Sequence, residues 1–293
     1  MTAPLKLNGF AYQTIVTQGA HIHVASAGSG PALLLLHGYP QTHLMWHKVA
    51  PSLAEKYHLI CPDLRGYGDS SKPNSDAQHT PYSKREMAKD MVDVMRQMGH
   101  EHFFVAGHDR GARVSHRMAL DFPEKVLKAA VLDIIPTYEM FKKIDQSIAT
   151  AYYHWFFLIQ DKGVPEHLIG LDPDFYLKDK LNRWSQYPEQ FDNAIVNQYL
   201  RCFKDPATIH ATCEDYRAAA SIDLQHDEAD LDKKISCPLL VLWGKHGIMG
   251  KHFDMLDIWQ QKADNVSGKA LDSGHFLAEE AATETLENLL SFF

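Results

Sequence analysis

One stretch of nine residues decides how this chain folds: Val105-Ala106-Gly107-His108-Asp109-Arg110-Gly111-Ala112-Arg113. It has the Gly-x-nucleophile-x-Gly pattern of a sharp turn between a buried strand and a helix, with Asp109 at the apex. Such a turn needs Gly107 and Gly111, because larger side chains at these positions would collide with neighbouring structure. The pattern predicts that the turn holds the side chain of Asp109 out into the open.

The residue at the apex also predicts the chemistry. A serine in this place must lose its proton before it attacks a carbonyl carbon, whereas the carboxylate of Asp109 is already charged. A carboxylate can displace a leaving group from saturated carbon and form an ester. We therefore expect alkylation chemistry rather than ordinary ester hydrolysis.

The composition indicates a large soluble globular protein. The chain has 293 residues, 45% of them hydrophobic, and a formal net charge of −8. It has no basic block or basic and aromatic stripe that would bind nucleic acid or an anionic membrane. The start of the chain lacks the pattern of a secretory signal, and no apolar run approaches the roughly 20 residues of a membrane span. A cytoplasmic protein is therefore expected, with neither nucleic acid nor membrane as a partner.

The cysteines indicate reduced, packed thiols rather than disulfides or a zinc site. They show no CxxC or Cys/His ligand spacing. Their positions are Cys61, Cys202, Cys213 and Cys237. We expect neither a metal nor an organic cofactor.

Apolar runs alternate with helical patterns along the chain, which is typical of an α/β protein with a mostly parallel sheet flanked by helices. Amphipathic or helical patterns cover Met87 to Met98, Gly111 to Phe122 and Leu277 to Phe293. Buried strands are expected at Ala32–Leu36, His58–Pro62, Phe103–Ala106, Ala129–Leu132 and Leu239–Trp243.

The segment from Ile134 to about Ile222 differs from the rest. Aromatic residues crowd together, strand-like runs disappear, and several prolines divide it into short pieces. We interpret residues 135–222 as a helical cap inserted after the strand that ends at Asp133. Residues 1–134 and 223–293 would then form the core, with the sheet resuming near Cys237-Pro238.

Two further motifs fit the turn at Asp109. His37-Gly38-Tyr39-Pro40 follows an expected strand, where the backbone N–H groups of Tyr39 and Arg110 can point at a developing oxyanion. Asp272-Ser273-Gly274-His275 lies on a loop after an expected final strand, where His275 can act as general base for the water that hydrolyses the ester. Each motif alone is more often structural, but together and in this order they predict one active site.

The histidine needs an acid that fixes its tautomer and stabilises its positive charge. The loop after Leu239–Trp243 carries no carboxylate, so Asp133, at the end of the preceding strand, is the predicted acid. Alternatively, Asp133 could be the N-cap residue of the first helix in the inserted segment. Asp257 is a poor rival because it lies within a helical pattern.

With these motifs, the chain resembles the fluoroacetate (haloacetate) dehalogenases of the α/β-hydrolase superfamily, from His37 to the C-terminal helix. The resemblance implies the α/β-hydrolase fold, and relatives suggest a homodimer. It is carried by the turn with its two arginines and by the segments Leu132-Asp133-Ile134-Ile135-Pro136-Thr137-Tyr138, His154-Trp155, Asp205-Pro206-Ala207-Thr208-Ile209-His210 and Asp215-Tyr216-Arg217-Ala218.

The resemblance implies that Arg110 and Arg113 bind the carboxylate of a small haloacid substrate. They are three residues apart at the start of a helix, hence on one face near the positive end of its dipole. There they could orient the α-carbon of the substrate toward Asp109 through charge-assisted hydrogen bonds. The alternative is a pair of surface residues in ordinary salt bridges.

The resemblance also implies that His154, Trp155 and Tyr216 bind the departing halide, since each offers an N–H or O–H donor. Trp184 aligns with a wall of the pocket. The alternative is that these aromatic residues only form the core of the cap.

The implied reaction is hydrolysis of 2-haloacetates such as fluoroacetate and chloroacetate to glycolate and halide, through an ester on Asp109. One alternative is an epoxide hydrolase, which would share the nucleophile and base and use Tyr216 and Tyr153 as acids. Against it, the residue after the nucleophile is arginine, and a buried charged group is costly unless an anion binds it. A non-catalytic α/β-hydrolase homologue that binds small acids is the second alternative.

Overall fold

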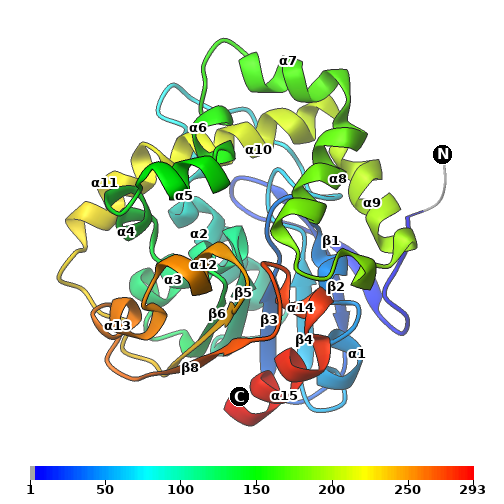
Figure 1. Ribbon diagram of the computed structural model, residues 1–293. Helices are drawn as coiled ribbons and strands as arrows, with labels where there is room; N and C mark the ends of the chain where they lie inside the picture. Colours follow the sequence, from blue (N-terminus) through cyan, green and yellow to red (C-terminus); the bar gives the residue numbers. More distant parts are fainter. Residues whose placement is uncertain (1–3) are drawn as a thin grey trace.

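The fold is organised around an eight-stranded sheet with the strand order β1-β2-β4-β3-β5-β6-β7-β8 (Figure 1). β2 runs antiparallel to β1 and β4, and all other neighbouring pairs are parallel. This arrangement is the α/β-hydrolase fold, as predicted. In this computed structural model, which describes residues 4–293, the strands are β1 Ala11–Val16, β2 His21–Ala27, β3 Ala32–Leu36, β4 His58–Pro62, β5 Phe103–His108, β6 Val126–Leu132, β7 Leu239–Gly244 and β8 Val266–Leu271.

The central strands are continuous aliphatic runs because helices cover both of their faces. Every residue of β3 is buried, and β5, β6 and β7 are buried over most of their length. All of the expected strands are present, including the final one before the His275 loop. β1 and β2 were not predicted, because their exposed positions carry polar residues such as Gln13 and His21 that break the apolar pattern.

Helices pack on both faces of the sheet. The predicted helix before β5 forms with Met87, Met91, Val94 and Met95 fully buried. The predicted C-terminal helix is instead two helices, because the backbone leaves the helical conformation at Ala281. These helices are α1 Ala50–Leu53, α2 Lys84–Gln97, α3 Arg110–Asp121, α12 Ile248–His252, α13 Met255–Gln260, α14 Leu277–Glu280 and α15 Ala282–Phe292.

The chain between β6 and β7 forms helices that lie as a layer above the sheet in Figure 1. Aspartates begin several of them: Asp172 and Asp205 each accept a backbone N–H and precede a proline in the first turn. The division into core and cap at residues 135 and 222 stays a prediction, and α11 extends past the second boundary. The helices are α4 Thr137–Lys142, α5 Gln146–Ala151, α6 His154–Phe157, α7 Val164–Leu171, α8 Pro173–Trp184, α9 Asn193–Phe203, α10 Pro206–Ala219 and α11 Ile222–Ala229.

The four cysteines are buried and unpaired, as expected. Within residues 4–293, no helix combines the length and the apolar character that crossing a bilayer would need.

Candidate active site

Asp109 lies on the sharp turn between β5 and α3. Its φ of 46° is in the left-handed region, a conformation that is rare for a residue with a side chain and is often found at functional sites. The turn is tight because a Cβ atom at Gly107 would press on the carbonyl of Gly111, and one at Gly111 would press on the carbonyl of His37. This is the predicted local geometry.

The expectation that Asp109 points into the open is wrong. Its exposed fraction is 8%, because aromatic residues of α6 and α8 cover the turn. Burial by itself would raise the pKa of Asp109, but the positive charges of His275 and Arg110 outweigh it, so the pKa lies below its usual value. Asp109 is therefore a buried carboxylate that stays charged.

The backbone N–H of Tyr39 donates to Oδ2 of Asp109 at 2.9 Å. This donor lies where the predicted oxyanion would form, since that oxygen carries the charge once water has attacked an ester on Asp109. The second expected donor, the N–H of Arg110, makes no hydrogen bond to this carboxylate within residues 4–293. The Tyr39 ring packs against Trp184 and Tyr216, with centroids 6.3 and 5.4 Å apart.

His275 and Asp133 are hydrogen bonded: Nδ1 lies 2.5 Å from Oδ2 of the aspartate. The other oxygen of Asp133 accepts the N–H of Gly244 at 2.9 Å. Burial would lower the pKa of His275, but the hydrogen bond and charge of Asp133 more than offset it, so the pKa lies above its usual value. Asp133 caps no helix, since α4 begins only at Thr137, and Asp257 lies within α13.

Arg110 and Arg113 are buried, with exposed fractions of 0% and 3%, so they are not the surface pair of the alternative interpretation. Nε and Nη2 of Arg110 donate to the Asp215 carboxylate at 3.0 and 2.7 Å. Nη1 of Arg113 donates to the carbonyl of Ile135 and the hydroxyl of Thr137, both at 3.0 Å. Within residues 4–293, Nη1 of Arg110 and Nε of Arg113 are buried without a partner.

The predicted halide-binding residues lie together although α6 and α10 are far apart in sequence. The ring of Tyr216 is 5.6 Å from that of His154 and 6.1 Å from that of Trp155. Burial, aided by the charge of Lys180, holds the pKa of His154 well below its usual value, so the ring is neutral. Its Nδ1 is buried without a partner among the described residues. Trp184 packs on His154 with centroids 4.5 Å apart.

A small inner cavity brings most of these groups together. Its volume is about 10 Å³, close to what one water molecule needs. Arg110 and Tyr216 do not line it among residues 4–293; they contact each other behind the wall, with the guanidinium 4.2 Å from the ring centre. Tyr152 lines it and was not predicted, since nothing in the aromatic run distinguishes it from Tyr153. The lining residues are Asp109, Arg113, Asp133, Tyr152, His154, Trp155, Trp184 and His275.

A larger outer cavity of about 380 Å³ adjoins the inner one and shares Tyr152, Trp184 and His275 with it. Arg183, His246 and Lys251 line it, whereas no aspartate or glutamate of the described chain does. Arg183 and His246 each pair with a carboxylate, of Asp179 and Asp272, at 2.6 Å, so Lys251, which has no salt bridge among the described residues, is the lining cation left to attract an anion.

Asp215 was not predicted as a functional residue. It is fully buried, accepts the hydroxyl of Tyr67 at 2.5 Å and pairs with the ammonium of Lys84 as well as with Arg110. Burial would raise its pKa, but Arg110 and Lys84 hold it far below the usual value. No sequence pattern marks this group, because Lys84 and Tyr67 reach Asp215 only in the folded chain.

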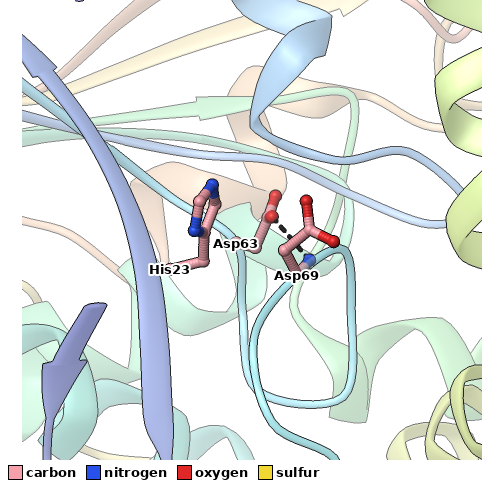
Figure 2. A group of neighbouring side chains, drawn as sticks. All are labelled: His23, Asp63 and Asp69. Atoms are coloured by element: carbon pink, nitrogen blue, oxygen red, sulfur yellow. Dashed lines mark hydrogen bonds between the residues drawn. The ribbon is translucent and has the colours of Figure 1, made fainter. Parts of the chain in front are cut away.

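His23, Asp63 and Asp69 form a group whose donor atoms are close enough to hold a cation (Figure 2). Their oxygens already have partners. Asp63 accepts three hydrogen bonds, from the N–H and ring of His43 and from the N–H of Asp69, each at 2.8 to 2.9 Å. Asp69 pairs through both oxygens with Arg201 at 2.9 and 2.7 Å. These contacts explain the group as a structural link between the core and α9.

The sequence and the fold are similar to those of known α/β-hydrolases. The family described as the alpha/beta hydrolase fold matches residues 31–282. The chain is 45% identical to a fluoroacetate dehalogenase of Burkholderia sp over 285 residues, covering 97% of this chain and 94% of that protein. It is 34% identical to a soluble epoxide hydrolase of Corynebacterium sp. over 283 residues, 94% of each. A solved α/β-hydrolase structure from Nostoc sp PCC 7120 has 54% identity and a TM-score of 0.97, covering 98% of this chain and 99% of that one.

Proposed function

The chain belongs to the α/β-hydrolase family, and we propose that it is a haloacetate dehalogenase, which hydrolyses 2-haloacetates such as fluoroacetate and chloroacetate to glycolate and halide. One observation carries the proposal. A charged carboxylate, Asp109, lies in a closed site where the two arginines keep buried N–H donors without a partner in residues 4–293. Buried donors without acceptors cost about 1–3 kcal/mol each, and a bound anion removes that cost.

In the first step, the substrate carboxylate accepts a hydrogen bond from the unpartnered Nε of Arg113, and Arg110, which does not line the inner cavity among residues 4–293, contributes its positive charge. This places the α-carbon before Asp109. An oxygen of Asp109 forms a bond to the α-carbon as the carbon–halogen bond breaks, and the bonding electron pair leaves with the halide. The donors of His154, Trp155 and Tyr216 stabilise the halide, which matters most for fluoride because it is a poor leaving group.

In the second step, His275 takes a proton from water, and the hydroxide attacks the ester carbonyl of Asp109. The negative oxygen that forms accepts the N–H of Tyr39. The intermediate then collapses, the glycolate oxygen leaves with the proton from His275, and the Asp109 acid loses a proton to solvent. Asp133 stabilises the charged histidine between these events. Each reaction thus releases halide, glycolate and one proton, using only side chains and water.

The remaining expectations belong to the same proposal. Residues 135–222 act as the cap that closes the site, the partner is a small haloacid, and the protein is a cytoplasmic homodimer. The outer cavity with its basic lining is the path by which the anionic substrate reaches the inner one.

An epoxide hydrolase is the second candidate, because a relative at 34% identity is named as one. The predicted acids for it do not both fit: the side chain of Tyr153 is 41% exposed and its hydroxyl accepts a hydrogen bond from Lys180 at 2.5 Å. Tyr152 would have to replace it as the partner of Tyr216.

Parallel assays with fluoroacetate, chloroacetate and styrene oxide test the proposal. We expect halide release from the haloacetates and no diol from the epoxide. Diol formation without halide release would favour the epoxide hydrolase. Tight binding of the acids without turnover would favour a non-catalytic binding protein.

A further inference from the structure

Glu280, the last residue of α14, accepts backbone hydrogen bonds from two separate segments of the chain. Its Oε2 accepts the N–H groups of Gln186 at 2.6 Å, Tyr187 at 3.0 Å and Gly274 at 3.0 Å. Its Oε1 accepts the N–H of Phe276 at 3.0 Å. One carboxylate therefore satisfies four main-chain donors.

The two segments are those that hold the walls of the site. Gly274 and Phe276 flank His275, while Gln186 and Tyr187 follow Trp184 at the end of α8. Figure 1 shows α14 beside this end of the helical layer. The carboxylate thus lies at the junction between the His275 loop and the helix that carries Trp184.

The two segments also touch directly. The N–H of His275 donates to the carbonyl of Trp184 at 2.8 Å. Gly274 has to be a glycine here, because a Cβ atom would lie 2.5 Å from that same carbonyl and from the nitrogen of Gln186. The side-chain rings of Trp184 and His275 also pack together inside the site, with their centroids 5.7 Å apart.

A carboxylate suits this junction for a physical reason. Backbone N–H groups in irregular segments have no ladder partners and need other acceptors. Hydrogen bonds to an ionised acceptor are roughly twice as strong as neutral ones. A glutamine of the same shape would turn its NH₂ group toward at least one of the four N–H donors, and two donors cannot pair.

We propose that Glu280 is a positioning residue that locks the His275 loop to the Trp184 end of α8, so that the general base and one wall of the pocket are placed together. Glu280 touches neither cavity among the described residues, so it acts through its neighbours. Its kinetic consequence rests on the proposed function. Since His275 works only in the second step, whereas Trp184 is a wall of the pocket in both steps, loss of the lock should slow ester hydrolysis more than halide release from the first turnover.

Hydrogen exchange tests the lock without any substrate. In Glu280→Gln, we expect amide exchange to become about tenfold faster in both segments, residues 185–187 and residues 274–276, relative to the unchanged chain. Glu284→Gln, an exposed glutamate on α15, is the matched control and should leave both segments unchanged. Unchanged exchange in either segment of Glu280→Gln would overturn the proposal.

Kinetics test its consequence. With chloroacetate, Glu280→Gln should show a burst of one chloride per site, a steady-state rate lowered about tenfold or more, and an ester that accumulates on Asp109 and is visible as added mass. Glu280→Asp keeps the charge and should recover part of both the exchange protection and the rate. It also serves as the variant to measure where the glutamine variant does not fold. Equal slowing of the burst and the steady state would contradict a role of Glu280 in placing the general base.

The two proposals fail separately. Should the unchanged chain release no halide from any haloacetate, the proposed function fails, while the exchange measurement still decides whether Glu280 ties the two segments together.

Discussion

The carboxylate of Asp215 accepts two hydrogen bonds along one edge of the guanidinium of Arg110, from Nε at 3.0 Å and from Nη2 at 2.7 Å, and the backbone carbonyl of Asp215 accepts Nη2 at 2.8 Å. All of these groups are buried. The contact leaves Nη1 as the one guanidinium nitrogen of Arg110 without a partner among the described residues. The orientation of an arginine proposed to attract the substrate is thus set by a residue that the substrate does not touch.

Replacing Asp215 by asparagine should destabilise the fold. The change removes the counter-charge of the buried Arg110 and the nearer of the two carboxylates beside Lys84, and breaking a buried pair costs about 3–5 kcal/mol. The folded-state pKa of Asp215 lies far below its unfolded value, so its stabilisation is fully present at neutral pH, begins to decline near pH 4 and is lost progressively as the pH falls toward the folded-state pKa. Urea unfolding at pH 7 and at about pH 2.5 measures both effects. A deficit equally large at the two pH values would contradict the electrostatic explanation.

Replacing Arg113 by lysine should weaken binding of the substrate carboxylate. Lysine keeps the charge but cannot both keep the Nη1 contacts with Ile135 and Thr137 and place a second N–H where Nε lies, so the KM for chloroacetate should rise about 10- to 100-fold. Chloroacetamide, which has no negative charge, is the matched substrate and its turnover should change little. A similar loss with both substrates would show that the variant damages the pocket rather than the anion contact.

Replacing His275 by asparagine should stop the reaction after the first step. Without the base, hydrolysis slows by about 10²–10⁴, and the ester on Asp109 accumulates as added mass. In the unchanged chain, a single turnover in heavy-oxygen water should place the label in Asp109 and leave the first glycolate unlabelled. Label in that glycolate would mean that water attacks the α-carbon directly.

The steady-state rate should depend on pH through His275. The histidine must be neutral to accept a proton, and its pKa lies above the usual 6.5, so activity should fall as the pH drops through a value higher than 6.5. Replacing Asp133 by asparagine removes the charge that raises this pKa and should shift the acidic limb to lower pH. A limb that stays in place would mean that another group controls it.

Lys251 should contribute to capture of the substrate at the outer cavity. Changing this exposed lysine to glutamate reverses a charge in the lining, so kcat/KM for fluoroacetate should fall about three- to tenfold at low salt and recover near 1 M salt. Lys269→Glu, an exposed lysine on β8 outside the lining, is the control. Equal effects of the two changes would point to net charge rather than to the cavity.

Much of the fold could be predicted from the sequence, because its signals are local. The buried parallel strands are unbroken aliphatic runs, and the turn at Asp109 depends on two glycines within the same nine residues. β1 was missed because it is an edge strand with mostly exposed polar residues, and β2, which lies between β1 and β4, was missed because histidines and a serine interrupt its apolar residues. The break at Ala281 has no glycine or proline to mark it.

Some residues of the candidate site could likewise be predicted from local sequence signals, and others could not. Asp109, His275 and Asp133 follow from their places at strand ends, and the structure brings them to one cavity. The environment of Asp109 was misjudged because its burial depends on side chains of α6 and α8 that sequence spacing cannot position. Asp215 and Glu280 were missed for a related reason: each acts through contacts between residues distant along the chain.

The acid that pairs with His275, Asp133, follows β6. The loop after β7 therefore does not have to supply this acid. Gly244 supplies only its backbone N–H to Asp133, while the side chains of His246, Ile248 and Lys251 face the outer cavity. Natural variation or laboratory evolution can therefore redesign this rim for acids of other size or charge while the reacting groups stay untouched. This part of the lining of the outer cavity can therefore change without altering Asp109, His275 or Asp133.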